Sequence, residues 1–353
     1  MIRRQLPLIL AVVWIAALFG VRAVVAGGRA ETVATSVTGA RLAVILLNWT
    51  DDTSQPFTAE QARAAIFTDP RSVAAFYTDT SYGRFALTGD VFGPYTVAYS
   101  KDPCLAGQWA ADARARAGVS GYDHFMYVWP AGRTQCAWGG IAEGVESFIN
   151  VGLHEPTMAH EFGHNLGLAH AQFTRCTDVN GISVQVSGNC VAYEQADLYD
   201  DMGRGWYTFN APHRASLGWL TSTVTATRSG TFTIAPLEWT TSAAQQVQVV
   251  PKKKGKITPY PYCVEFRQSY GWDAFPANNP WITNGVLIHH DFCMSTAYTH
   301  LMDATPGSHP EDPGGAALDD APLLVGQTFA DPDITMTTLS VSPAGAVIAV
   351  VIR

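Results

Sequence analysis

The segment His160–His170, with the sequence HEFGHNLGLAH, constrains this chain more than any other feature of its sequence. His160 and His164 are four residues apart, so on an α-helix their side chains project from one face, one turn apart. Gly167 predicts the end of that helix, because glycine adopts the backbone conformation that a sharp reversal needs. His170 follows three residues later and can fold back toward the first two histidines. The segment therefore predicts a helix that ends in a metal-binding turn.

Three neutral imidazoles with one open coordination position are typical of a catalytic zinc site, whereas a structural site usually closes all four positions, often with thiolates. The cysteines of this chain are not placed to do that. Nitrogen ligands also suit zinc better than calcium or magnesium. The sequence thus predicts Zn²⁺ held by His160, His164 and His170, with Glu161 as the catalytic general base. The competing interpretation, an amphipathic core helix with ordinary histidines, does not account for five fixed positions of this pattern.

The pattern HExxHxxGxxH resembles the zinc-binding signature of the metzincin peptidases. Metzincins also have a methionine turn beneath the metal, and Met202 in YDDMGRG matches it. Within the metzincins the chain resembles the gametolysin-like peptidases. The supporting segments are Ser81–Val91, Met158–Ala171, Tyr199–Gly203 and Asn210–Leu220. The resemblance implies a zinc endopeptidase that acts on extracellular proteins or glycoproteins.

Two features near the motif qualify this resemblance. Some metzincins place a tyrosine two residues after the methionine, but Arg204 occupies that position here, so no oxyanion-stabilising tyrosine is carried over. Tyr199 and Tyr207 are nearby, and neither is assigned that role. In metzincins the segment that corresponds to Trp138–Ala142 is an edge strand that pairs with the extended substrate. An interior strand with a glycine bulge is an equally good interpretation.

Length and composition favour one large or two modest domains. The chain has 353 residues, of which 47% are hydrophobic and 15% charged, so it can bury a sizeable core. Its formal net charge of −8 offers no basic face, and no nucleic-acid partner is expected. We expect an α+β protein: a metzincin-like catalytic domain over 41–220, with a twisted mixed sheet and the active-site helix, then an all-β, sandwich-like domain over 221–353.

Local patterns predict the elements of both parts. Before residue 221, strands are expected at Arg41–Asn48, His124–Trp129 and Ala137–Val151, with a hairpin at Phe85–Val97. Helices are expected from Thr58, and at Val73–Thr78, Ala106–Ala117, Pro156–Leu166 and Ala211–Leu220, while 171–201 is expected to be loop-rich. After residue 221, strands are expected at Gly230–Ile234, Gln246–Val250, Tyr262–Phe266, Gly285–His289, Thr335–Val341 and Ala346–Ile352.

The first 26 residues are typical of a secretory signal peptide. Arg3 and Arg4 precede an apolar run over 6–19, and small residues suit cleavage after Ala26. An uncleaved membrane anchor is the alternative, but the run is short for a span and Arg22 interrupts it. The sequence therefore predicts a secreted protein without stable membrane insertion after cleavage, and a flexible leader over 27–40.

Six cysteines follow the predicted signal peptide, and an even number in an exported chain favours disulfides. Six cysteines allow 15 pairings, of which sequential pairing is the simplest. The expected pairs are Cys104–Cys136, Cys176–Cys190 and Cys263–Cys293.

The remaining histidines and acidic pairs receive structural interpretations. His124, His154, His213, His289, His290, His300 and His309 lack ligand spacing to the motif. The pairs Asp200–Asp201 and Asp319–Asp320 lack the spaced oxygen ligands of a calcium loop and are expected in solvated turns. The predicted function is a secreted zinc endopeptidase with a protein or glycoprotein substrate. One alternative is a non-catalytic binding or adhesion protein on a peptidase scaffold, and another is a zinc amidase that acts on cell-wall peptide with the same chemistry. Nothing in the sequence specifies an oligomeric state.

Overall fold

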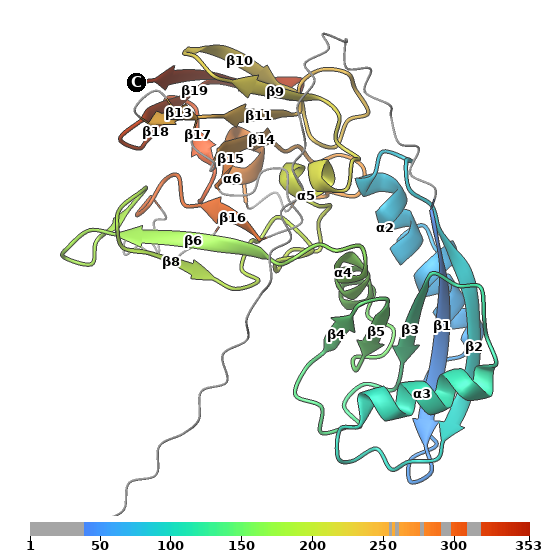
Figure 1. Cartoon of the computed structure of the whole chain (residues 1–353). Coiled ribbons are helices and arrows are strands. Elements are labelled where there is room, and N and C mark those ends of the chain that lie inside the picture. Colours follow the sequence, from blue (N-terminus) through green and yellow to red (C-terminus); the bar gives the residue numbers. More distant parts are fainter. Residues whose placement is uncertain (1–38, 254–255, 258–260, 276–278, 291–297, 309–318) are drawn as a thin grey trace, which may run out of the picture. The chain divides into compact units, whose positions relative to one another are not determined.

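The computed structural model describes residues 39–253, 256–257, 261–275, 279–290, 298–308 and 319–353. The predicted signal peptide, and the predicted leader up to residue 38, lie outside the described residues. Among the helices of the described part, none has the length and apolarity needed to cross a membrane. The described chain is a mixed α/β fold with more strand than helix (Figure 1).

A five-stranded sheet forms the first part of the chain, in the order β2-β1-β3-β5-β4. Its first four members in this order run parallel, and the edge strand β4 is antiparallel to β5. The bounds are β1 Ala40–Trp49, β2 Leu87–Val97, β3 His124–Val128, β4 Gly140–Glu143 and β5 Glu146–Ile149. The predicted strands at Arg41–Asn48 and His124–Trp129 are therefore confirmed.

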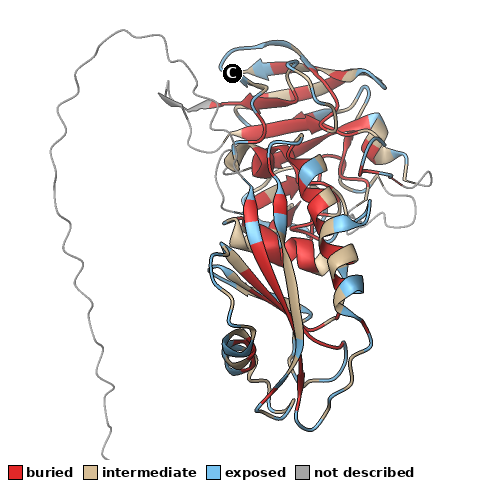
Figure 2. Cartoon of the chain, turned by 90° about the vertical axis from the view of Figure 1, so that its right-hand side faces the viewer, coloured by how far each residue is buried: buried red, intermediate tan, exposed pale blue. Residues whose placement is uncertain are grey.

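Helices cover both faces of this sheet, so β1 is buried along almost its whole length. Leu42, Val44 and Leu46 pack into one core with helices α2 and α4, whereas Ile45 and Leu47 point to the other face and pack with α3. Figure 2 shows buried residues along the central strands and on the inner sides of the helices. The helix bounds are α1 Ala59–Arg63, continued by a π-helical turn at Ala64–Thr68, α2 Val73–Thr80, α3 Ala106–Ala117 and α4 Glu155–Asn165.

Two predictions for this sheet are wrong. The expected hairpin at Phe85–Val97 is the single strand β2, because its glycines serve close packing rather than a turn. A Cβ on Gly89 would lie 1.9 Å from the backbone oxygen of Leu42 on the neighbouring strand. The expected single strand at Ala137–Val151 is the hairpin β4–β5, which turns at Gly144 with a φ of 59°.

Two further sheets contain most of the remaining strands. A nine-stranded sheet has the order β7-β6-β16-β15-β14-β11-β9, with β17 paired to β15 and β8 to β6, and a four-stranded sheet has the order β10-β20-β19-β18. Both sheets contribute to one hydrophobic cluster that includes Val264 and Ile288 of the larger sheet and Met336 and Ile348 of the smaller one. Their bounds are β6 Ala171–Thr177, β7 Ser183–Val184, β8 Cys190–Tyr193, β9 Thr223–Ala226, β10 Gly230–Ile234, β11 Gln246–Val249, β14 Tyr262–Phe266, β15 Gly285–His290, β16 Thr299–Met302, β17 Leu323–Leu324, β18 Thr328–Ala330, β19 Ile334–Ser342 and β20 Gly345–Ile352. The remaining elements are α5 Ala211–Ser216, α6 Trp281–Asn284, β12 Lys252–Lys253 and β13 Lys256–Ile257.

The six strands expected after residue 221 are all present within a residue or two of their predicted ends. The segment 171–201, expected to be loop-rich, contains long irregular stretches but also the strands β6, β7 and β8, which the sequence analysis did not predict. Strand β6 also pairs in parallel with β16, so hydrogen bonds link segments on both sides of residue 221. Ser36–Arg353 form one compact unit. The domain boundary near 221 stays a prediction.

Disulfides join Cys104 to Cys136 and Cys176 to Cys190, which confirms two of the expected pairs. The first joins the residues just before α3 to the loop between β3 and β4, and the second joins the neighbouring strands β6 and β8. The third expected pair includes Cys293, which lies outside the described residues.

Candidate metal centre and active site

Helix α4 presents the first two histidines of the motif. Its start is capped by His154, whose Nδ1 accepts a hydrogen bond from the backbone N–H of Thr157. After the helix, Gly167 has a φ of 92°, and the chain reverses as the sequence predicted. The turn brings His170 back, so that one ring nitrogen from each of the three motif histidines lies within 4.8 Å of the others.

Each histidine is oriented by a hydrogen bond at Nδ1. The His160 ring donates to the backbone oxygen of Asp201 (2.6 Å), and the His164 ring donates to that of Leu168 (2.8 Å). His170 Nδ1 lies 2.5 Å from the carboxylate of Glu194. The Nε2 atoms are left to converge, and those of His164 and His170 are 3.1 Å apart. Fixing one ring nitrogen in this way sets the tautomer that a metal-binding imidazole needs.

The electrostatics of the site favour neutral imidazoles. Burial lowers the pKa of His160 to about 4, and it also lowers the pKa of His164. A neutral ring keeps a lone pair for a metal ion, so protons compete weakly for these ligands near neutral pH. Three imidazole nitrogen donors, with no thiolate or fourth ligand beside them in the described part of the chain, fit a catalytic zinc ion better than a structural one.

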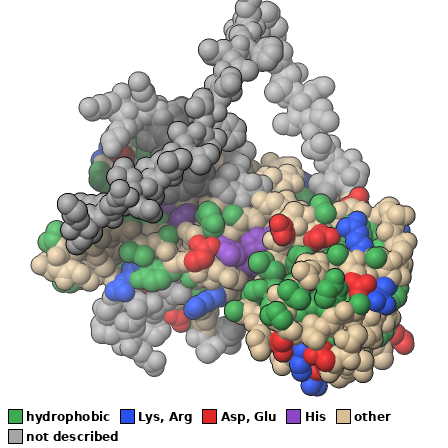
Figure 3. Space-filling model, turned by 60° about the horizontal axis from the view of Figure 1, so that its bottom comes forward, with side chains coloured by type: hydrophobic (Ala, Val, Ile, Leu, Met, Phe, Trp, Pro, Cys, Tyr) green, Lys and Arg blue, Asp and Glu red, His purple; other side chains and the backbone are tan. Residues whose placement is uncertain are grey.

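Glu161 lies beside the histidines in the same cavity, which has a volume of about 830 Å³. Its side chain is buried, and burial raises its pKa to about 8. In Figure 3 histidine side chains open to the surface of the molecule between acidic and hydrophobic groups. His164 and His170, which line the cavity, are only partly buried, so the cavity is accessible from solvent.

Gly140 brings the edge strand β4 against Glu161. A Cβ at this position would lie 2.5 Å from Oε1 of Glu161 and 2.7 Å from Cγ2 of Thr157. Strand β4 pairs with β5 on one side and ends the sheet on the other. Of the two interpretations of Trp138–Ala142, the edge strand is confirmed, and Gly140 provides close approach instead of a bulge.

The turn that contains Met202 packs directly under helix α4. Met202 is fully buried, and a Cβ on Gly163 of the helix would lie 2.4 Å from its sulfur. The same turn provides the Asp201 carbonyl that orients His160. The sequence analysis missed Gly163 and Gly140, because a small residue required by long-range packing has no local signal.

The prediction that Asp200 and Asp201 lie in a solvated turn is wrong. Asp200 and Asp201 are buried and do not lie in a solvated turn. Burial opposes ionisation of Asp200, but an ion pair with His213 at 3.0 Å and backbone donors outweigh it, and the net pKa is lowered. Burial raises the pKa of Asp201 well above its ordinary value, and Asp200 and Glu161 add repulsion. Asp320 is also buried, so the prediction for the pair Asp319–Asp320 is wrong for that residue.

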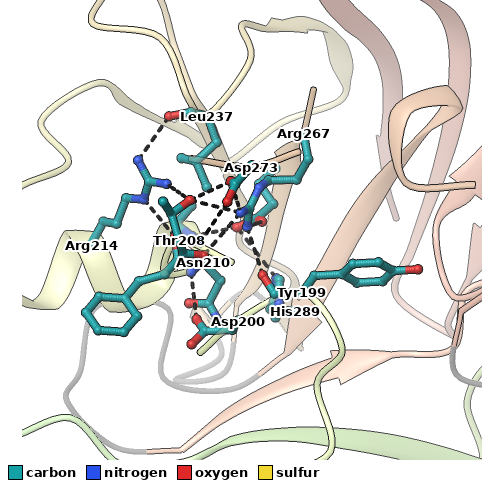
Figure 4. A network of polar contacts seen from close by, with 12 residues as sticks. Tyr199, Asp200, Thr208, Asn210, Arg214, Leu237, Arg267, Asp273 and His289 are labelled. Atoms are coloured by element: carbon teal, nitrogen blue, oxygen red, sulfur yellow. Dashed lines mark hydrogen bonds and ion pairs between the residues drawn. The ribbon is translucent and has the colours of Figure 1, made fainter. Parts of the chain in front are cut away.

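A buried polar network anchors the segment that follows the turn (Figure 4). Arg267 is fully buried and forms ion pairs with Glu238 (2.8 Å), Glu265 (3.2 Å) and Asp273. The same guanidinium donates to the backbone oxygens of Tyr199 and Thr208, both at 3.1 Å. Because Arg267 and Glu265 lie at the end of β14, the larger sheet holds both ends of the segment 199–208.

Further contacts of the network reach the chain after the turn. Asn210 donates to Thr299 of β16 (2.9 Å). The backbone N–H of Ala211 donates to Glu265 (2.5 Å), and Arg214 donates to Leu237 (3.2 Å). His289 of β15 pairs with Asp197, 3.2 Å away, just before the turn.

Glu194 is a third residue that sequence reasoning missed. It fixes the ring of His170, and Gln172 donates to its other carboxylate oxygen. A carboxylate behind a metal-binding histidine raises the basicity of the ring and sets its orientation. The 24 residues between Glu194 and His170 gave no spacing signal.

The other histidines take the structural roles expected of them. His154 caps a helix, and His213 and His289 are buried partners of carboxylates. His309 lies outside the described residues. Among the residues that the structure describes, only the three motif histidines form a cluster that could hold a metal ion.

Three convergent imidazoles and one carboxylate in an open cavity are typical of mononuclear metal-dependent hydrolases. The model of the gametolysin peptidase M11 family matches residues 41–256, more than half of the chain. The chain therefore belongs to this family, as the sequence resemblance predicted, and the membership indicates a metallopeptidase.

Among solved structures the chain is similar to the archaemetzincin of Methanopyrus kandleri. The sequences are 15% identical, the match covers 51% of this chain and 93% of that chain, and the TM-score is 0.25. No match is found among curated proteins.

Proposed function

We propose that this protein is a secreted zinc endopeptidase that hydrolyses peptide bonds of extracellular proteins or glycoproteins. The observation that carries the proposal is the convergence of His160, His164 and His170 in a cavity that Glu161 also lines. Membership of a peptidase family supports it. The hydrogen bonds at each Nδ1 leave three Nε2 atoms as the ligands for zinc.

When bound, zinc supplies a Lewis acid that lowers the pKa of a coordinated water to about 7 and polarises the scissile carbonyl. Glu161 accepts the proton of the attacking water and passes it to the leaving amine. Its burial makes the carboxyl a stronger base than an exposed glutamate, which suits a group that must take up and then release a proton.

We propose that the substrate backbone binds along the edge of β4 that faces away from β5. An extended peptide that adds there as a further strand gains main-chain hydrogen bonds without regard to its sequence. Gly140 holds β4 against Glu161, so such a peptide would pass close to the general base. The proposal therefore gives β4 a positioning role.

Export is supported by the two disulfides, which persist in oxidising compartments, and by the signal-like first 26 residues. For the part after residue 221 we keep the predicted β-sandwich, supported by the hydrophobic cluster that its two sheets share.

The test is the variant Glu161→Gln in the full secreted chain. Wild type should bind one zinc and cleave casein or gelatin in a chelator-sensitive way. The variant should keep its zinc and lose about 10²–10⁴-fold in kcat. Glu155→Gln, on the first turn of the same helix, is the matched control and should retain activity.

Full activity of Glu161→Gln would remove this residue from its role. Zinc binding by a wild-type protein that cleaves no peptide would favour the adhesion protein that the sequence left as an alternative.

A further inference from the structure

The loop Gly203–Trp206 lines two cavities. The first is the cavity of about 830 Å³ that contains the candidate metal centre. The second has a volume of about 460 Å³ and is also lined by Arg71, Tyr207 and Trp272. Both share Arg204, Gly205 and Trp206, so the two cavities adjoin at this loop.

The backbone of this loop is held in place. A Cβ on Gly203 would lie 2.2 Å from the backbone oxygen of Asp197, and one on Gly205 would lie 2.1 Å from that of Leu198. The N–H of Arg204 donates to Asp197 at 2.7 Å. The two glycines thus press the loop against the preceding turn, while the side chain of Arg204 is exposed.

No hydrogen bond or ion pair engages the Arg204 guanidinium within the described part of the chain. The other arginine of the second cavity differs, because Arg71 lies 3.8 Å above the ring of Trp272 and donates to the Trp272 carbonyl at 3.2 Å. Arg204 therefore has all of its five N–H donors available to a ligand.

The second cavity is positive and has aromatic walls. No aspartate or glutamate is among its described lining residues, although the whole chain carries a formal charge of −8. Trp206 stacks on Phe76 with 4.9 Å between ring centroids, and it meets Trp272 edge-on at 5.1 Å. These contacts fix the walls of the cavity, so little order is lost when a ligand binds.

We propose that the second cavity is a substrate subsite for an acidic side chain, an aspartate or a glutamate near the scissile bond, with Arg204 as its specificity-determining residue. The planar guanidinium matches a carboxylate in a two-point hydrogen-bonded pair, and the tryptophan walls pack against the methylene groups of the ligand. This inference rests on the proposed peptidase function and names its substrate class.

The test compares peptides that differ only by glutamate or glutamine at each position around the cleaved bond. At one position, wild type should show about 3–10-fold higher kcat/KM for the glutamate peptide, the gain expected of an accessible charge-assisted pair. In Arg204→Gln this preference should vanish, so that the kcat/KM values for the two peptides become equal. Arg228→Gln, an exposed arginine outside both cavities, is the matched control and should keep the preference.

The two proposals fail in different ways. Cleavage of both peptides at equal rates, or an unchanged preference in Arg204→Gln, would overturn the subsite and leave the peptidase function intact. Absence of all cleavage by zinc-loaded wild type would overturn the peptidase function. In that case, calorimetry with the Glu161→Gln protein compares its affinities for the glutamate and glutamine peptides. Tighter binding of the glutamate peptide that is lost on adding Arg204→Gln would support the subsite, and equal affinities would overturn it.

Discussion

Helix α4 and the segment 197–214 hold the candidate metal site by different forces. Helix α4 packs through apolar side chains, among them Met158 and Phe162, against α2 and the first sheet. The segment 197–214 is held to the larger sheet by buried charges, above all by Arg267 with its three carboxylates. Two histidines come from the first region, and the carbonyl that orients one of them comes from the second.

The two regions should differ in how well they tolerate amino-acid substitutions. Apolar packing is non-directional, so a residue of similar volume restores most of it. A buried ion pair needs each partner, because removing one leaves a desolvated charge without compensation. We therefore expect the segment 197–214 to be the more fragile support of the metal site.

The largest effect should come from Arg267→Met. The substitution keeps the apolar stem but leaves three buried carboxylates without their cation, and we expect a loss of about 3–5 kcal/mol in the free energy of unfolding. Met158→Leu in the apolar region is the matched control and should cost less than about 1.5 kcal/mol. Urea unfolding of both variants measures the two losses in the free energy of unfolding. Equal losses would contradict the claim that the segment 197–214 is the more fragile support.

The next effect is pH-dependent and concerns a buried carboxyl in the C-terminal part. Burial, with repulsion from Asp320, raises the pKa of Asp303 to about 7. Because the folded pKa exceeds the unfolded value of about 3.9, this group favours folding at low pH and loses that contribution as the pH rises toward 7. Asp303→Asn should therefore gain about 4 kcal/mol in unfolding free energy relative to wild type between pH 4 and pH 8, since each unit of pKa shift corresponds to about 1.4 kcal/mol. Urea unfolding at both pH values measures it, and a difference independent of pH would contradict the raised pKa.

A smaller effect is expected at the third histidine. Glu194→Gln removes the carboxylate that fixes His170, and zinc affinity should fall about 10–100-fold. The side chain of Glu194 is 55% exposed, so the stability of the metal-free protein should change little. Zinc competition titrations measure the affinity, with the remote exposed Glu60→Gln as control. A large loss of metal-free stability with unchanged affinity would assign Glu194 a structural role.

The smallest effect tests a single polar contact inside the apolar region. The buried hydroxyl of Tyr77 donates to the backbone oxygen of Ala159 in α4 at 2.7 Å. Tyr77→Phe should cost about 1 kcal/mol and leave zinc affinity unchanged. A change in zinc affinity would show that apolar packing alone does not position the helix.

Prediction from the sequence succeeded where the signal was local. The apolar run of β1, the alanine-rich α3 and the helix with its glycine stop were all found close to their ends. It failed where glycines serve packing instead of turning, as at Gly89 in β2, and where short exposed strands such as β8 are stabilised by pairing with β6. The four residues of β8 are apolar but all exposed, so no alternation of polar and apolar residues marks this strand in the sequence.

The motif spacing alone determined which three histidines belong together and which glutamate accompanies them, because helix periodicity and a glycine reversal act within eleven residues. Tertiary structure alone decided what supports them. Asp201 and Glu194 orient two of the imidazole rings. Gly140 lets the edge strand β4 lie against Glu161, and Arg267 beside the larger sheet hydrogen-bonds to Tyr199 in the segment 197–214. The three hydrogen bonds among these contacts join residues that are 24, 41 and 68 positions apart in the sequence. Only the folded chain brings such groups within hydrogen-bonding distance.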